Sequence, residues 1–412
     1  MKNLAVAILF AIVLALFTGC EMFPVPSDPY GNTTVTTKTP TDPASSEAVA
    51  SPASPTETAA APSATGGEEQ TTPAATRTPS PSPSEQPTPT PDPTQGMIFP
   101  DSDERLLMWD ELTELSAEKL DLARNEIFAR SGYHFTKVYY SDYYGKLSWY
   151  QVDPGFSESK FSDTQRANIT LIRVAESAIK GQLVEIKSGT KLDYDQDGDL
   201  ETLTFSSPDD NHMILKMKDG TATTEWAIDC DTPSKKVYLG DITLIDGVLD
   251  LFVDEYGPSS DYLVYVAGIK HKAFQNRATI PGTIKQLKLD KKGAISTSKR
   301  MNILMTWFCT VKYKLNSSGK LALIGQSSYS MGNFKCKTKV ALPLRKKASA
   351  TSAVAFTVPA GTEVSLVSTD DKRWIKIKAP AGEGWLEMDD SITLKDPNIS
   401  GIDAFDGLLM AD

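Results

Sequence analysis

Hydrophobic and polar residues follow several distinct patterns along this chain, and the first is an unbroken apolar run near its start. The run extends from Leu4 to Phe17, after Lys2, and small residues follow it up to Cys20. It is shorter than the ~20 residues that cross a bilayer comfortably as a helix, and a basic, then apolar, then small order is typical of a secretory signal. We therefore expect residues 1–19 to be a signal peptide.

A second pattern, across residues 20–98, has almost no large apolar side chains. It is dominated by Pro, Thr, Ser and Ala, as in "TPSPSPSEQPTPTPDPT". Such a composition cannot bury enough surface to offset the entropy lost on ordering. About 70 residues of this kind span on the order of 50 Å as a flexible coil and about 200 Å as polyproline helix. The sequence predicts a disordered stalk.

A helical spacing of apolar residues marks residues 99–181. Ser116 and Ser162 are good N-caps, and Gly132 is placed to end the first of two long helices. The two apolar arcs are formed by Leu120, Ala123, Ile127 and Phe128, and by Ile169, Leu171, Ile172, Ala175 and Ile179. Each arc is expected to pack against the other, and the module is expected to fold alone.

Polar residues interrupt both apolar arcs. Arg124 lies between Leu120 and Phe128, while Asn168 and Glu176 lie on the arc of the last helix. A guanidinium on a buried face needs a partner, so we predict a buried pair between Arg124 and Glu176.

Another charged pair on the first long helix has a different prediction. Glu126 and Arg130 are four residues apart in the favourable order. This spacing predicts a solvated bridge along the helix surface.

Short runs rich in β-branched and aromatic residues fill the rest of the chain. Runs such as "ETLTF", "HMILKM" and "DYLVYVAGI" predict an all-β domain over 182–333, a small sandwich or propeller-like fragment. Closely spaced strands and turns predict a small barrel over 334–395, followed by a tail at 396–412. The fold class is therefore multidomain: a small α-helical domain, an all-β domain and a C-terminal barrel.

The residues before Cys20 suggest how the chain is attached to a membrane. "LFTGC" resembles the bacterial lipoprotein box, in which a peptidase cuts before the cysteine and the thiol carries diacylglycerol. The resemblance implies lipidation of Cys20 and a location on the extracytoplasmic face of the bacterial cell membrane. A simple secreted protein with a chance cysteine is the alternative.

The helical segment resembles a known family. "SAEKLDLARNEIFARSGYHF", the pair Trp149 and Tyr150, and "ANITLIRVAE" resemble the YARHG domain of bacterial exported proteins. The resemblance implies an extracytoplasmic module. The family's Tyr-Ala-Arg-His-Gly run is Phe128 to Gly132 here, with Ser131 in place of the histidine, so no acid-base role is expected at that position.

The C-terminal segment resembles the bacterial SH3-like domain. Val340 to Arg345, "PAGTEVSLV", "RWIKIK" and "GEGWL" follow the order of its strands. The resemblance implies an SH3-like β-barrel that binds peptidoglycan or its peptides, with Trp374 and Trp385 at the binding surface. The alternative is that both tryptophans only fill the barrel.

The acidic loop "DYDQDGDLE" is the clearest chemical signal. Alternate carboxylates with a following glycine form the tight, oxygen-lined turn that a hard cation requires. The loop resembles the calcium loops of FG-GAP and integrin-type propeller repeats, and "IDGVLDLFVDEYG" resembles a degenerate second copy without the ion ligands. The predicted calcium ligands are Asp193, Asp195, Asp197, the Asp199 carbonyl and Glu201. A solvated acidic turn is the alternative.

Net charge and cysteine content narrow the function. A net charge of −11 argues against binding of nucleic acid and against a basic face for anionic lipid. Besides Cys20 only Cys230, Cys309 and Cys336 are present, so either one bridge, Cys309 to Cys336, or three free thiols is expected.

Catalytic motifs are not evident in the sequence. The histidines are His134, His212 and His271, and none belongs to a metalloprotease or hydrolase motif. We expect a non-enzymatic binding protein whose β domains contact peptidoglycan or a cell-surface protein. The alternative is a wall-active hydrolase using Cys309 and His271.

Overall fold

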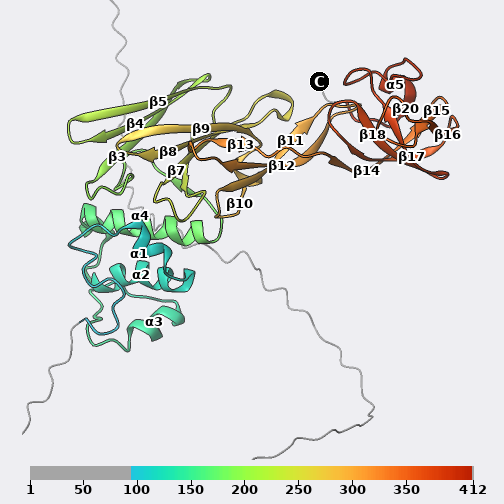
Figure 1. The fold of residues 1–412 in the computed structure, drawn as a ribbon. Coiled ribbons are helices and arrows are strands. Elements are labelled where there is room, and N and C mark those ends of the chain that lie inside the picture. The colour runs from blue at the N-terminus through green and yellow to red at the C-terminus, as the bar shows by residue number, and fades with distance from the viewer. Residues whose placement is uncertain (1–93, 411–412) are drawn as a thin grey trace, which may run out of the picture. The chain divides into compact units, whose positions relative to one another are not determined.

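The computed structural model describes residues 94–410 of this chain (Figure 1). The predicted signal peptide, Cys20 and nearly all of the predicted stalk lie outside the described residues. Among residues 94–410, no helix is both long enough and apolar enough to span a membrane.

Four helices make up the first part. They are α1 (Trp109–Thr113), α2 (Ala117–Arg130), α3 (Val138–Tyr144) and α4 (Asp163–Ile179), with a 3-10 turn η1 (Glu158–Lys160) before α4. The predicted caps are present: the Ser116 hydroxyl accepts the Lys119 N–H, and Ser162 forms a capping box with Gln165. Gly132 follows α2 with φ +84°, a conformation that favours glycine.

The predicted pair between α2 and α4 is present. Arg124 Nε lies 3.3 Å from Glu176 Oε2, and the two side chains are only 16% and 15% exposed. Arg124 also contacts Asp121 Oδ1 at 2.7 Å, a partner that the sequence did not reveal. Tyr140 of α3 donates to the other oxygen of Asp121. The Arg124 guanidinium therefore joins α2 to α4, and α3 is linked to it through Asp121.

Asn168 is buried on α4 and satisfied by backbone groups. Its amide donates to the carbonyl oxygens of Ser102 and Arg105, and its oxygen accepts the N–H of Leu107. The segment before α1 therefore packs onto α4 through hydrogen bonds that one side chain provides.

The predicted solvated bridge between Glu126 and Arg130 is wrong. Glu126 is fully buried and accepts the N–H groups of Ile98 and Phe99. Arg130 donates to the Phe99 carbonyl and the Ser102 hydroxyl instead. The segment before α1 covers this face of α2, so Glu126 bonds its backbone and Arg130 bonds its backbone, the Ser102 hydroxyl and the Asp103 carboxylate.

Three antiparallel sheets follow the helices. The first has strand order β2-β3-β4-β5, the second β1-β6-β7-β8-β9 and the third β10-β11-β12-β13. Their bounds are β1 (Val184–Ile186), β2 (Thr190–Leu192), β3 (Glu201–Asp209), β4 (His212–Asp219), β5 (Ala222–Asp229), β6 (Val237–Gly240), β7 (Asp250–Glu255), β8 (Leu263–Lys270), β9 (Ala273–Pro281), β10 (Lys288–Leu289), β11 (Ala294–Met301), β12 (Trp307–Leu315) and β13 (Leu321–Leu323). Short 3-10 turns lie at Pro258–Ser260 (η2) and Ile284–Gln286 (η3).

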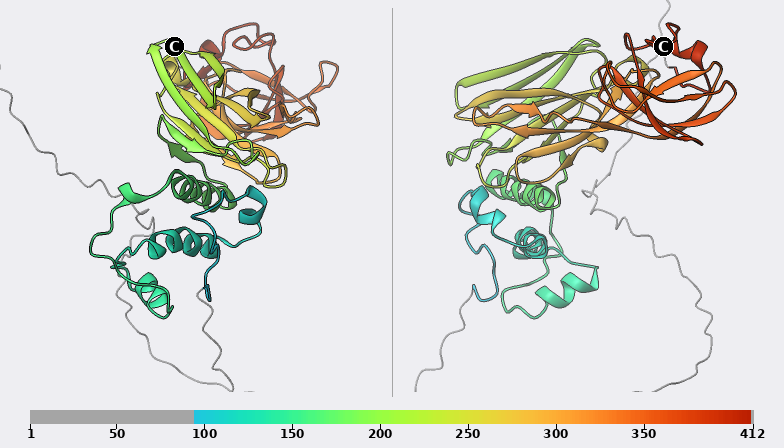
Figure 2. Two further views of the ribbon diagram at one scale, coloured as in Figure 1. Left: turned by 90° about the vertical axis from the view of Figure 1, so that its left-hand side faces the viewer. Right: turned by 45° about the vertical axis from the view of Figure 1, so that its right-hand side comes forward.

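The helices and the first two sheets share one core. Helix α4 lies between α1 and α2 on one side and β1, β2 and β6 on the other (Figures 1 and 2). One continuous set of buried residues includes Trp109 and Ile172 from the helices and Tyr194, Leu203 and Leu251 from the β region. The helices do not have a separate core, because α4 is apolar toward both neighbours. That the helical module folds alone stays a prediction.

The C-terminal sheet has seven strands in the order β16-β15-β19-β18-β17-β14-β20. It curls around a core that it shares with Met301 of β11 and with Trp307 and Val311 of β12. Its strands are β14 (Tyr329–Thr338), β15 (Leu342–Arg345), β16 (Val354–Val358), β17 (Glu363–Thr369), β18 (Trp374–Ala379), β19 (Gly382–Glu387) and β20 (Phe405–Asp406), and helix α5 (Gly401–Ala404) precedes β20.

The observed sheet exceeds the limits that the sequence predicted for this domain. It begins at Tyr329 rather than at 334. The expected tail 396–412 contributes β20, in which Phe405 pairs with Thr338 and is buried. An apolar Phe405 has a place in the core, which is why the chain returns to the sheet.

Candidate metal centre

The acidic loop lies between β2 and β3 and brings four carboxylates together. Oxygens from Asp193, Asp195, Asp197 and Glu201 all lie within 4.8 Å of one another. Asp199 is exposed and its carboxylate is outside this cluster; its predicted contribution was only the backbone carbonyl. These residues offer oxygen ligands alone, which suits a hard cation.

Backbone hydrogen bonds fold the loop around the cluster. The two carboxylate oxygens of Asp193 accept the N–H groups of Asp197 at 3.0 Å and Gly198 at 2.9 Å. Gly198 has φ +94° and Gln196 has φ +62°, so the chain turns sharply at both positions. The sharp turns bring alternate side chains to one side, as the sequence predicted.

Two carboxylate oxygens in the cluster lack a hydrogen-bond donor among the described residues. Glu201 is fully buried; its Oε2 accepts the Tyr194 N–H at 2.8 Å, and its Oε1 has no partner. Asp195 Oδ2 accepts the Lys272 N–H at 2.6 Å, while its buried Oδ1 has no partner. Leaving a buried acceptor unpaired costs about 1 to 3 kcal/mol, more when it is charged. A bound cation would satisfy both oxygens.

The electrostatics of the cluster favour the binding of a cation. Burial first, and then the neighbouring carboxylates of Asp195, Asp193 and Asp197, raise the pKa of Glu201 to about 7. Burial also raises the pKa of Asp193. The pKa of Asp197 is lowered because it bonds Lys272, whose ammonium lies 2.8 Å from Asp197 and 2.8 Å from Asp219. One lysine at the rim leaves the centre acidic.

Gln196 ties the loop to helix α1. Its Oε1 accepts the backbone N–H of Trp109, the first residue of α1, at 2.6 Å. Its Nε2 donates to the Asp193 carbonyl at 2.7 Å. Sequence reasoning found neither Gln196 nor Lys272, because α1 and the β8–β9 turn are distant in sequence and no local pattern marks them.

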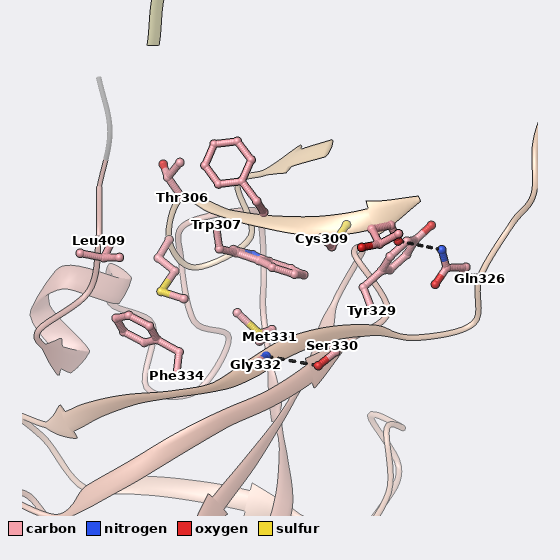
Figure 3. Close-up of a pocket in the computed structure, with 13 residues that line it drawn as sticks. Thr306, Trp307, Cys309, Gln326, Tyr329, Ser330, Met331, Gly332, Phe334 and Leu409 are labelled. Carbon is pink, nitrogen blue, oxygen red and sulfur yellow. Dashed lines mark hydrogen bonds between the residues drawn. The ribbon is translucent and has the colours of Figure 1, made fainter. Parts of the chain in front are cut away.

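A separate pocket of about 620 Å³ lies between β12 and β14 (Figure 3). Apolar side chains from the two strands face one another across it, and Gln326, Ser330 and Thr306 supply polar groups. The larger side chains that line it are Met305, Trp307, Cys309, Tyr329, Met331 and Phe334. Its size is in the range of small-molecule sites, about 300 to 1,000 Å³.

The remaining predicted residues are placed as follows. Cys230, Cys309 and Cys336 are buried and free, so the disulfide alternative is wrong. Trp374 is buried in the C-terminal sheet, as the core-filling alternative predicts, whereas Trp385 is half-buried.

Residues 95–177 match the family model of the YARHG domain. This range covers α1 to α3 and nearly all of α4. No curated protein and no solved structure matches the chain.

Proposed function

We propose that this chain is a lipid-anchored, extracytoplasmic protein of the bacterial envelope that binds a partner without catalysing a reaction and is stabilised by calcium. YARHG domains occur in extracytoplasmic proteins, which supports export. The resemblance of "LFTGC" to a lipoprotein box supports anchoring through Cys20.

The calcium cluster is the observation that carries this proposal. Its carboxylates converge, are partly buried and include two oxygens without donors among the described residues. Calcium accepts six to eight oxygens at flexible angles, whereas magnesium demands a small octahedral shell. Extracellular sites of this kind bind at about 10⁻⁴ to 10⁻³ M, a range that matches an exported protein.

Calorimetry of the mature chain tests the metal proposal. We expect one calcium to bind in this concentration range and magnesium to compete weakly. Asp195→Asn combined with Asp197→Asn should abolish binding, and Asp209→Asn, in an exposed turn, serves as the control. No heat of binding in the wild-type chain would reduce the loop to an acidic turn.

The partner is proposed to be peptidoglycan or a cell-surface protein, bound by the β domains. The SH3-like resemblance of the C-terminal sheet supports a wall ligand, and Trp385 is its half-exposed aromatic residue. The apolar pocket between β12 and β14 is a second candidate surface for the partner (Figure 3).

A sedimentation experiment with insoluble cell wall tests the partner. The chain ending at residue 328 should remain in solution, while the full mature chain should sediment with the wall. Trp385→Ala should weaken sedimentation, and Tyr139→Ala, which alters an exposed aromatic on α3, should not. Equal sedimentation of the truncated and full chains would place the binding surface elsewhere.

A wall-active hydrolase is the less favoured alternative. Burial raises the pKa of the Cys309 thiol to about 11, which disfavours the nucleophilic thiolate. His271 lies in the turn between β8 and β9, and Cys309 lies on β12 of another sheet. Hydrolysis of purified peptidoglycan that is lost in Cys309→Ala would support this alternative.

A further inference from the structure

The chain between β6 and β7 repeats the frame of the calcium loop. In the calcium loop, Leu192 pairs with Glu201 across the loop ends, and the Tyr194 N–H donates to Glu201 Oε2 at 2.8 Å. We refer to Asp241–Asp250 as the second loop. Here the residue before the first aspartate, Gly240, pairs with Asp250, and the Ile242 N–H donates to Asp250 Oδ2 at 3.0 Å.

The turn inside the second loop also matches. Asp246 Oδ1 accepts the Val248 N–H at 3.1 Å, as Asp197 Oδ1 accepts the Asp199 N–H at 3.0 Å. The following glycine has positive φ in both loops, +64° at Gly247 and +94° in the calcium loop. The second loop, one residue longer, therefore resembles the calcium loop in its closing pair and its turn, and it carries three carboxylates, Asp241, Asp246 and Asp250. That this stretch lacks ion ligands stays a prediction.

The centre of the second loop holds an arginine. Arg277 extends from β9, is 6% exposed and forms an ion pair with Asp250 through Nε. Its Nη2 lies 3.8 Å from Asp246 Oδ2, and its Nη1 donates to the Gly319 carbonyl at 3.3 Å. Gly268, opposite Asp250, makes room for it, because a Cβ there would lie 2.8 Å from Arg277 Nε.

The acidic groups around Arg277 are as deeply buried as those of the calcium loop. Asp241 and Asp250 are fully buried. Burial is the main cause that raises the pKa of Asp241 to about 9 and that of Asp250 to about 7, and the charge of Asp246 contributes to both shifts. The Trp109 side chain donates a hydrogen bond to Asp241, and no basic side chain pairs with Asp241 in the ion pairs of the described residues. The second loop therefore has the same need for positive charge as the first.

We propose that the guanidinium of Arg277 is a built-in cation at a second site, in the place that calcium takes in the first. A charge that belongs to the chain cannot dissociate. The wild-type protein therefore binds one divalent ion, and removal of the guanidinium opens the second loop to another. The one-ion stoichiometry rests on the proposed calcium binding at the first loop, whereas the behaviour of the second loop does not.

Calcium titration of four mature chains tests this proposal. They are the wild type, Arg277→Ala, the double variant Asp195→Asn with Asp197→Asn, and that double variant combined with Arg277→Ala. The expected numbers of bound ions are one, two, none and one. If the wild type binds none but Arg277→Ala binds one, the calcium proposal for the first loop fails while the present one stands.

Thermal unfolding provides the second measurement. In chelator, Arg277→Ala should melt well below the wild type, and millimolar calcium should restore most of the loss even when the first loop is disabled. Arg277→Gln, which is shorter and uncharged but keeps an amide donor, should fold more readily and show the same calcium response. The absence of an added site and of calcium-dependent recovery in both variants would overturn the proposal.

Discussion

The two acidic loops have the same backbone frame but obtain their positive charge from different sources. The calcium loop leaves two buried oxygens without donors among the described residues. In the second loop, Arg277 from β9 stands among the carboxylates. Because Arg277 belongs to the chain, the structure at the start of β7 does not depend on the concentration of ions in solution. With calcium bound as proposed, the start of β3 instead depends on an ion from the surroundings.

The largest loss of stability should follow removal of the Arg277 guanidinium. Arg277→Ala in chelator leaves Asp250 buried and unpaired, and removing one partner of such a pair typically costs about 3 to 5 kcal/mol. Denaturant unfolding measures the loss. Lys335→Ala, which breaks the exposed pair with Glu363, is the control and should change little. Equal stability of Arg277→Ala and the wild type would show that the guanidinium does not hold the second loop.

Arg124, another arginine that pairs with two carboxylates, provides a comparison with Arg277. Arg124 faces Asp121 and Glu176 but is partly open to water, so its loss should cost less than the loss of Arg277. We expect Arg124→Met to lower the unfolding free energy by about 1 to 3 kcal/mol, below the range for fully buried pairs. Glu176→Gln should lower it less, because Asp121 still pairs with the guanidinium. If Arg124→Met leaves the free energy of unfolding unchanged, the pair of Arg124 with Glu176 is solvated and contributes no net stability.

Calcium should stabilise the first loop by a smaller amount. Binding to the folded state alone adds RT ln(1 + [L]/Kd), about 1.4 kcal/mol when calcium is ten times Kd. The melting temperature of the mature chain should rise in calcium and remain constant for Asp195→Asn with Asp197→Asn. A rise that persists in this variant would place the ion elsewhere.

The pH dependence in chelator separates the two loops further. The folded pKa of Glu201 is raised above its ordinary value of 4.5 to about 7. Its contribution to stability is therefore present below about 4.5 and is lost as pH rises through about 7. The folded pKa of Asp241 is raised to about 9, so its contribution to stability is lost as pH rises through about 9.

Glu201→Gln isolates this dependence. The variant should lose less stability than the wild type between pH 5 and 7.5 in denaturant unfolding, because an uncharged amide does not titrate. Calcium should reduce the difference, since it stabilises the carboxylate of the wild type. Parallel curves for the two proteins in chelator would contradict a raised pKa at Glu201.

The smallest effect concerns the link between the calcium loop and helix α1. Gln196→Gly keeps the positive φ but removes the bonds to Trp109 and Asp193, each worth about 0.5 to 1.5 kcal/mol. In the wild type, calcium should slow hydrogen exchange of the Trp109 amide. In the variant this protection should be lost while calcium still binds. Unchanged protection would show that other contacts carry the coupling.

The sequence by itself determined the features that depend on neighbouring residues. The caps at Ser116 and Ser162 and the turn at Gly132 are local, because a cap bonds an N–H only a few residues away. The calcium loop is also local, since alternate side chains and Gly198 fix its shape. The pair of Arg124 with Glu176 followed from helix periodicity, which places both on the facing sides of two packed helices.

Tertiary structure alone decided which distant groups complete these local units. Lys272 reaches the calcium loop from the turn between β8 and β9, and Arg277 reaches the second loop from β9. Nothing near either loop in sequence specifies these two residues. Glu126 bonds the backbone of Ile98 and Phe99, because the segment before α1 covers its face of α2. Helix α4 joined its core to the sheets because it is apolar on two sides, and a periodic pattern identifies a buried face without identifying what buries it.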